Sequence, residues 1–162
     1  MKRAFFFIVT LGVIVAFSGC SGGSSTSRSR GGASTPTRAP ASLIVRTVTP
    51  LGQILVDGSG RTLYLFEAES TKAATCSGAC AQTWPPFLTS GSPHLGSGGK
   101  QSLLGTMRRS DGTLQVMYNG HLLYYFAGDT KPGDTKGEGL NSFGAGWDAV
   151  SPAGDKIERP GG

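Results

Sequence analysis

An internal repeat constrains the fold of this chain more than any other feature of its sequence. Residues 49–69 and 109–129 lie sixty positions apart and share identical residues at six aligned positions. The identical pairs are turn glycines and large apolar side chains: Gly52/Gly112, Val56/Val116, Gly60/Gly120, Leu63/Leu123, Tyr64/Tyr124 and Phe66/Phe126. Because such pairs define a supersecondary unit, the sequence predicts a domain built from two similar units.

Each copy of the repeat has the pattern of a β-hairpin. In the second copy, residues 113–118 and 121–127 flank an Asn-Gly pair, which is the strongest short hairpin signal. In the first copy, residues 53–57 and 61–67 flank a Gly-Ser-Gly turn. We therefore predict two repeated β-hairpin units.

The side chains of these strands are apolar on both faces. In strand geometry Tyr64 and Phe66 share one face, and Leu63 and Leu65 share the other. Residues 123–126 repeat this arrangement. Strands of this kind are covered on both sides, so we expect the hairpins to pack as a small sandwich or barrel-like domain. The motif aromatics are then core residues rather than an exposed ligand platform.

The composition agrees with a mainly β fold. The 162 residues include 26 Gly and 9 Pro, which argues against a helical bundle, and only 15% are charged, which excludes a charged coiled coil. One short helix is expected near the cysteine pair, between Cys76 and Trp84, because Pro85-Pro86 ends any helix there.

The N-terminus has the features of a bacterial export signal. Residues 1–3 are positively charged, and residues 4–17 are almost wholly apolar but too short to span a hydrocarbon core of about 30 Å. Ser18-Gly19-Cys20 follows and resembles a lipobox, in which signal peptidase II cleaves before the cysteine. We predict a signal peptide over residues 1–19 and a diacylglycerol anchor on Cys20.

The charge of the chain is concentrated in its N-terminal arm. Residues 20–42 are rich in Ser, Gly and Arg, and we expect them to form a disordered tether. From Leu43 onward ten basic and ten acidic residues balance, although the whole chain carries +5. The repeat β domain, predicted over residues 43–160, thus lacks the basic excess of a nucleic-acid-binding domain. The expected partners are the membrane, through the lipid anchor, and an unknown envelope protein or ligand.

Cys76 and Cys80 remain once Cys20 is assigned to the lipid. An even pair in an exported protein favours a structural disulfide. A redox-active pair and a metal site are the alternatives. A zinc site would need two more ligands, and the two histidines, His94 and His121, lie at no recognised spacing.

Several motifs in one order resemble those of bacterial secreted repeat lipoproteins of unknown function. Their Tyr-x-[Phe/Trp/Tyr]-x-x-Asp motif matches in full in the second copy, and the first copy ends on Glu instead of Asp. The six motif residues are Tyr64, Phe66, Glu69, Tyr124, Phe126 and Asp129. Segments 76–86 and 131–135 also match, as does the closing Trp147…Ser151-Pro152. The resemblance implies an extracytoplasmic protein and brings no established activity.

Three classes of function follow as hypotheses. The first is a lipid-anchored, non-catalytic binding or structural module of the cell envelope. The second is a redox or electron-transfer accessory, suggested by the cysteine pair, four tyrosines and two tryptophans. The third is a calcium-stabilised loop that uses Asp129, Asp134 and Glu138, since hard cations prefer carboxylate oxygens.

An enzyme is the least supported class. The chain has no G-x-S-x-G nucleophile elbow, and its carboxylates have no spacing that places them across a cleft. We therefore name no catalytic residue and expect no cofactor or resident metal. The soft ligands Met107, Met117, His94 and His121 are explained by core packing and by turn positions.

Overall fold

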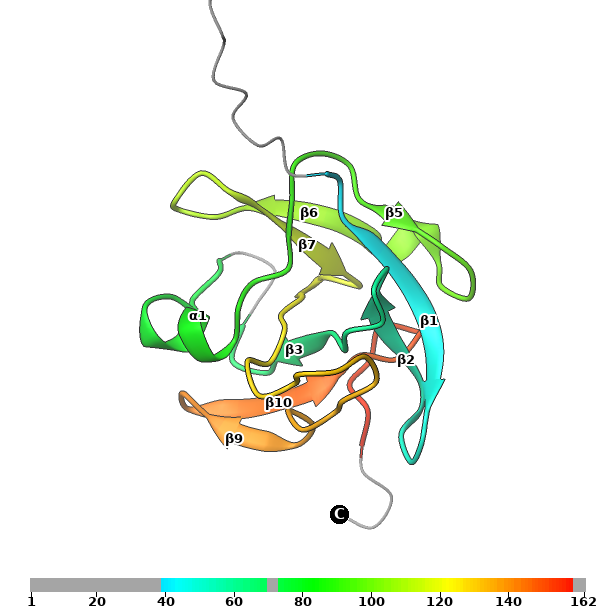
Figure 1. The fold of residues 1–162 in the computed structure, drawn as a ribbon. Coiled ribbons are helices and arrows are strands. Elements are labelled where there is room, and N and C mark those ends of the chain that lie inside the picture. The colour runs from blue at the N-terminus through cyan, green and yellow to red at the C-terminus, as the bar shows by residue number, and fades with distance from the viewer. Residues whose placement is uncertain (1–38, 70–72, 159–162) are drawn as a thin grey trace, which may run out of the picture. The chain divides into compact units, whose positions relative to one another are not determined.

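The computed structural model describes residues 39–69 and 73–158 (Figure 1). The predicted signal peptide, Cys20 and most of the predicted tether lie outside these residues. The described residues form ten strands in three sheets, with the short helix α1 (Ala79–Thr83) and the 3-10 turn η1 (Gln101–Leu103). The strands are β1 (Ser42–Val48), β2 (Gly52–Asp57), β3 (Tyr64–Phe66), β4 (Leu88–Thr89), β5 (His94–Leu95), β6 (Leu104–Arg108), β7 (Leu114–Tyr118), β8 (His121–Leu122), β9 (Leu140–Ser142) and β10 (Ala145–Ala149). The predicted mainly β fold is confirmed, and so is the helix beside the cysteines.

Each repeat begins one strand earlier than the sequence comparison predicts. β1 pairs antiparallel with β2 over six residue pairs, and β6 pairs antiparallel with β7 over five. Residues 44–48 of β1 and 104–108 of β6 lie sixty positions apart, so these strands are equivalent. Gly52 and Gly112 connect each pair with nearly equal φ angles of 81° and 83°. The folded repeat is a three-segment meander rather than a hairpin alone.

Both predicted turns form, but the strands after them leave the hairpin early. In the second copy Asn119 (φ 49°) and Gly120 (φ 81°) both adopt the positive φ that a type I′ turn requires. In the first copy the N–H of Asp57 donates to the carbonyl of Arg61 at 2.9 Å. The predicted strands 61–67 and 121–127 nevertheless pair with their own hairpin partners only in their first residues. Their later residues pair with the other repeat or with β10.

The two repeats meet at their motif tyrosines. The N–H of Tyr64 donates to the carbonyl of Tyr124, and the N–H of Tyr124 donates to the carbonyl of Tyr64, both at 2.9 Å. β3 then continues along β10, which lies between β3 and β9 (Figure 1). The backbone therefore joins one repeat to the other at equivalent positions.

The strands at this junction separate two apolar clusters. Leu63 and Leu65 pack in one cluster, and Tyr64 and Phe66 pack in the other. Residues 122–125 alternate in the same way. The prediction that these strands are covered on both faces is confirmed. None of the described sheets closes into a barrel, so the arrangement is closer to the predicted sandwich.

Across the described ranges, no helix has the length and apolar character needed to cross a membrane.

Candidate functional site

The motif tyrosine of each repeat is hydrogen-bonded to the motif acid of the other repeat. Tyr64 Oη donates to Asp129 Oδ2 at 2.6 Å, across 65 positions of sequence. Tyr124 Oη donates to Glu69 Oε2 at 2.7 Å, across 55 positions. We refer to these two contacts as the reciprocal pairs. The motif therefore connects the two repeats instead of serving each one separately.

The second oxygen of each acid fixes the loop that follows it. Asp129 Oδ1 accepts the N–H of Lys136 at 2.9 Å. Glu69 Oε1 accepts the N–H groups of Thr75 and Cys76 at 2.6 and 2.9 Å. Glu69, which replaces the Asp of the motif in the first repeat, thus makes both kinds of bond that Asp129 makes: one to a tyrosine and one to the following loop.

Burial governs the ionisation of these groups. It raises the pKa of Asp129 above its usual range, against the opposing effect of the bonds from Tyr64 and Lys136. Burial, and then the neighbouring carboxylate, raise the pKa of Tyr64 and of Tyr124 well above the ordinary phenol value. The phenols are therefore protonated donors over the physiological range.

A stack of the two tryptophans lies between the reciprocal pairs. The rings of Trp84 and Trp147 are parallel within 5°, with centroids 4.0 Å apart, and both are fully buried. Tyr64 meets Trp84 edge-on at 5.5 Å, and Tyr124 meets Trp147 edge-on at 5.3 Å. Phe66 stacks on Trp147 at 4.2 Å, and Phe126 packs on Trp84 at 4.6 Å. We call these six residues the aromatic cluster.

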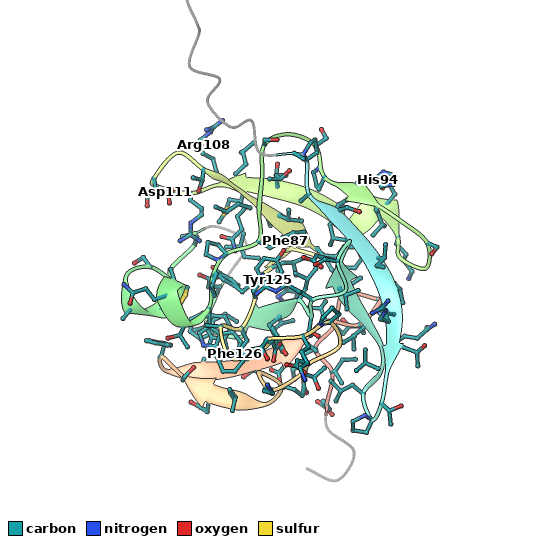
Figure 2. The ribbon with its side chains drawn as sticks, in the orientation of Figure 1. Phe87, His94, Arg108, Asp111, Tyr125 and Phe126 are labelled. Atoms are coloured by element: carbon teal, nitrogen blue, oxygen red, sulfur yellow. A yellow bond between two sulfur atoms is a disulfide. The ribbon has the colours of Figure 1, made fainter. Side chains whose placement is uncertain are left out.

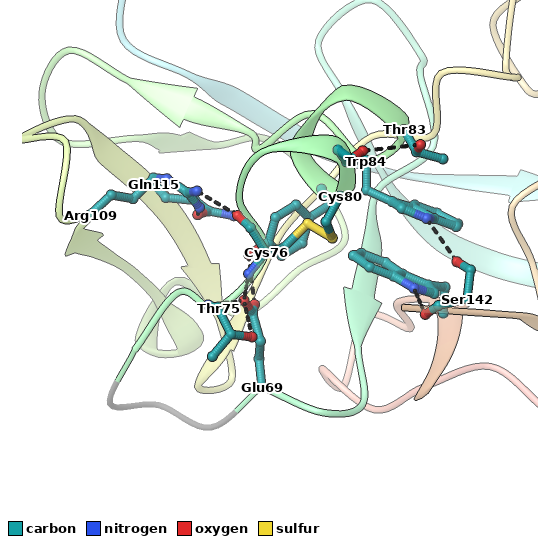
Figure 3. The surroundings of a disulfide bond; sticks show 12 residues. Glu69, Thr75, Cys76, Cys80, Thr83, Trp84, Arg109, Gln115 and Ser142 are labelled. Atoms are coloured by element: carbon teal, nitrogen blue, oxygen red, sulfur yellow. Dashed lines mark hydrogen bonds between the residues drawn. A yellow bond between two sulfur atoms is a disulfide. The ribbon is translucent and has the colours of Figure 1, made fainter. Parts of the chain in front are cut away.

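Ser142 of β9 satisfies both indole N–H groups of the stack. Its hydroxyl oxygen accepts from Trp84 Nε1 at 3.1 Å, and its carbonyl accepts from Trp147 Nε1 at 3.0 Å (Figure 3). A buried indole N–H without a partner would destabilise the core, so this residue permits both tryptophans to be buried side by side.

One motif aromatic is less buried than the other three. Tyr64, Phe66 and Tyr124 are core residues, and Phe126 is partly buried and packs against their cluster. Phe126, labelled in Figure 2, packs on Trp84 and precedes the exposed Ala127.

Cys76 and Cys80 form the predicted disulfide, which belongs to the same apolar cluster. The two cysteines are only 1% and 7% exposed. The buried Arg109 holds the backbone at Cys76, because its Nη2 donates to the carbonyl of Cys76 at 2.7 Å (Figure 3). Arg109 Nη1 donates to Gln115 Oε1 at 2.5 Å. The disulfide is therefore enclosed by protein on several sides.

The carboxylates of the proposed calcium loop face different parts of the domain. Asp129 bonds to Tyr64, Asp134 forms an ion pair with Lys136 at 3.1 Å, and Glu138 Oε2 accepts the N–H of Ala149 at 2.7 Å. Within residues 39–69 and 73–158, no three His, Cys, Asp or Glu side chains are grouped so that they could bind a metal ion. Asp134 also accepts the N–H groups of Thr130 and Lys131 and so caps a turn, whereas Asp129 and Glu138 connect distant parts of the domain.

The histidines and methionines that could ligate a soft metal are dispersed. His94 is on β5 and exposed, whereas His121 begins β8. Met107 and Met117 pack against the apolar cluster that contains the tryptophans. His121 lines a shallow hollow of about 340 Å³ with the ion pair Lys156–Glu67, whose Nζ and Oε1 lie 2.8 Å apart.

The sequence pointed to the two tryptophans only as oxidisable residues and motif members, and their stacking was not predicted. The roles of Arg109 and Ser142 beside the aromatic cluster and the disulfide were not predicted either. The available signal is that the chain's two tryptophans each follow one copy of the repeat. Their mutual contact depends on how the repeats pair, which local sequence patterns do not specify.

A family model described as a secreted repeat of unknown function matches residues 45–87 and 105–151. The two matched segments begin at equivalent positions of β1 and β6, in agreement with the folded repeat. No curated protein and no solved structure matches the chain.

Proposed function

Since the chain belongs to the family of secreted repeats of unknown function, we propose that it is a lipid-anchored, non-catalytic module of the cell envelope. In this role the domain binds an envelope protein or ligand, or supports the envelope structurally, while Cys20 attaches it to a membrane. Membership of a secreted family places the domain outside the cytoplasm.

The observation that carries this proposal is the use of the motif side chains within the fold. Both motif tyrosines are fully buried, and each donates to a carboxylate of the other repeat. Each of those carboxylates also accepts backbone N–H groups. Acids and phenols engaged in this way hold the repeats together and are poorly placed to act on a substrate. The motif is then a signature of architecture, and specificity for a partner belongs to surface loops.

The anchor is tested in the bacterial host with the substitution Cys20→Ala and the matched control Ser21→Ala. We expect Cys20→Ala to abolish labelling with radioactive palmitate and to leave an unprocessed precursor. Ser21→Ala retains labelling and processing. Labelling that persists in the Cys20→Ala protein would overturn the lipid anchor.

The partner is sought by affinity capture of the anchored protein from native membranes, with the Cys20→Ala protein as the control. A protein or glycan that is recovered with the anchored form, and that rebinds the purified chain, supports the binding role. Turnover of a substrate by the purified chain would contradict the non-catalytic part of the proposal.

A second candidate function is a redox or electron-transfer accessory, and the aromatic cluster is the observation that favours it. The disulfide is a poor candidate for this chemistry, because thiol exchange requires access to sulfur and both cysteines are buried. A native protein that carries a metal, or whose disulfide is reduced by mild dithiol, would favour a conventional redox centre. A colourless, metal-free protein whose disulfide resists mild dithiol would count strongly against this function.

A further inference from the structure

The tyrosine and tryptophan side chains of this protein are all buried, and four of the six form a chain of ring contacts. The chain has four tyrosines and two tryptophans. All six are at most 9% exposed. Tyr64, Tyr124, Trp84 and Trp147 form a contiguous set within the aromatic cluster. The partly buried Phe126 packs on Trp84 with ring centroids 4.6 Å apart.

Each tyrosine of the set has a base positioned to take its proton. A phenol is oxidised readily only if its proton leaves together with the electron, because the phenol radical cation is a very strong acid. The carboxylates of Asp129 and Glu69 lie 2.6 and 2.7 Å from the two phenol oxygens. Burial raises the pKa of Asp129, which makes this carboxylate a stronger proton acceptor than an ordinary aspartate.

The other two tyrosines belong to the other apolar cluster: the hydroxyl of Tyr125 donates to Asp57 Oδ2 at 2.9 Å, whereas Tyr118 has no carboxylate acceptor among its hydrogen bonds with the described residues. This tyrosine is equally buried, but its hydroxyl donates to the carbonyl of Pro152 at 2.9 Å, and a carbonyl is too weak a base to take the proton. Tyr118 also belongs to the other apolar cluster, away from the tryptophans. It therefore serves as a natural internal comparison.

The tryptophan stack supplies a path between the two tyrosines. Two indole rings that are parallel at 4.0 Å share a positive charge better than one ring alone, because their π-systems overlap. Each ring also touches one tyrosine edge-on. A charge placed on either indole thus lies next to a phenol that can neutralise it.

We propose that the aromatic cluster is a site of one-electron oxidation that ends on Tyr64 or Tyr124. The inference rests on the second candidate function. An outer-sphere one-electron oxidant, such as a high-potential metal complex or a diffusible radical, removes one electron from the Trp84–Trp147 stack. An electron from a motif tyrosine then refills the stack. The O–H bond of that phenol breaks, and its proton forms an O–H bond with Asp129 or Glu69. The products are the reduced oxidant, a neutral tyrosyl radical and a protonated carboxyl group.

The proposal is tested by flash photolysis of the full chain in detergent, with photogenerated tris(bipyridine)ruthenium(III) as the oxidant. Transient absorption distinguishes tryptophan radicals from tyrosyl radicals. We expect a tryptophan radical that converts to a tyrosyl radical, with slower conversion in deuterium oxide because a proton moves in that step. The double variant Tyr64→Phe/Tyr124→Phe is expected to keep the tryptophan radical and lose the tyrosyl radical. Each single variant is expected to lose part of the tyrosyl signal.

Two controls make the test decisive. Tyr118→Phe removes an equally buried tyrosine and is expected to leave the tyrosyl signal unchanged. Asp129→Asn keeps the shape of the acid but removes its basicity, and it is expected to reduce the share of radical on Tyr64. A tyrosyl signal that survives in the double variant overturns the proposal, as does conversion that is equally fast in deuterium oxide. The deuterium comparison uses the unaltered protein, so the test does not depend on variants that fold. None of these outcomes bears on palmitate labelling at Cys20, so the lipid-anchor proposal stands or fails separately.

Discussion

The bond between Tyr64 and Asp129 is predicted to be a substantial part of the stability of the domain. At neutral pH it joins a buried phenol to an ionised carboxylate at 2.6 Å, and bonds of this charge-assisted kind contribute about 1.5–3 kcal/mol. Tyr64→Phe removes only the hydroxyl and should cost about 2 kcal/mol. Asp129→Ala also removes the acceptor of the Lys136 N–H, so it should cost about 3 kcal/mol.

The two substitutions should not be additive. Once the carboxylate is gone, the phenol has lost its main acceptor, and removing its hydroxyl costs little more. We therefore expect the double variant to be about as unstable as Asp129→Ala alone, which corresponds to a coupling energy of about 2 kcal/mol. Such a value is large beside a total stability of about 5–15 kcal/mol for a domain of this kind.

The assay is urea unfolding followed by tryptophan fluorescence, on the chain from Ser21 onward. This chain keeps every described residue and lacks the predicted signal peptide and Cys20. With a slope of about 1–3 kcal/mol per molar urea, a change of 2 kcal/mol moves the unfolding midpoint by roughly 1 M. A shift of this size distinguishes the unfolding midpoint of the parent from those of Tyr64→Phe, Asp129→Ala and the double variant.

A second cycle supplies the control, because Tyr64 and Glu69 belong to the same repeat but are not bonded partners. Glu69 accepts from Tyr124 instead. Tyr64→Phe and Glu69→Ala are expected to add within about 0.5 kcal/mol. If Tyr64 couples to Glu69 as strongly as to Asp129, or couples to neither, the exchange of partners between repeats is refuted.

Three further predictions concern stability and use the same urea assay. Phe66→Ala should lower the free energy of unfolding by about 3–5 kcal/mol, because Phe66 is buried on Trp147. Phe126→Ala should lower it clearly less, because Phe126 is only partly buried. Equal losses would contradict the difference in burial. Replacing Cys76 and Cys80 together by Ala should cost about 2 kcal/mol, the chain-entropy value for so short a loop, and a loss several times larger would assign the disulfide a wider role. Raising the pH above about 10 should progressively destabilise the domain, because the raised pKa of Tyr64 and Tyr124 means that the folded state binds their protons more tightly than the unfolded state. The double variant Tyr64→Phe/Tyr124→Phe should lose stability less steeply over that range, and an equally steep loss would exclude these phenols as the cause.

Features of the fold that depend on neighbouring residues could be predicted from the sequence. The Asn-Gly turn at 119–120 follows from the φ angles that those residues accept, and the coverage of both strand faces follows from the alternation at 63–66. The disulfide follows from an even cysteine pair in an exported chain.

Features that depend on how the repeats pair could not be predicted in this way. Glu69 is five residues from Tyr64, yet it bonds to Tyr124, and no local pattern distinguishes those two acceptor arrangements. The early end of both hairpins has the same origin, because the backbone of Tyr64 pairs with that of Tyr124. Phe126 is less buried than Phe66, its sequence equivalent, and it packs on Trp84 whereas Phe66 stacks on Trp147.

The exchange of bonding partners also has a consequence for symmetry. A freestanding repeat would have a tyrosine without its acid and an acid without its tyrosine. Two identical copies related by a two-fold axis would satisfy both at once, because in such an interface residue i contacts j and j contacts i. The present chain satisfies both pairs within one polypeptide, so its two repeats need not be identical. One repeat ends its motif in Glu69 and is followed by the disulfide, and the other ends in Asp129.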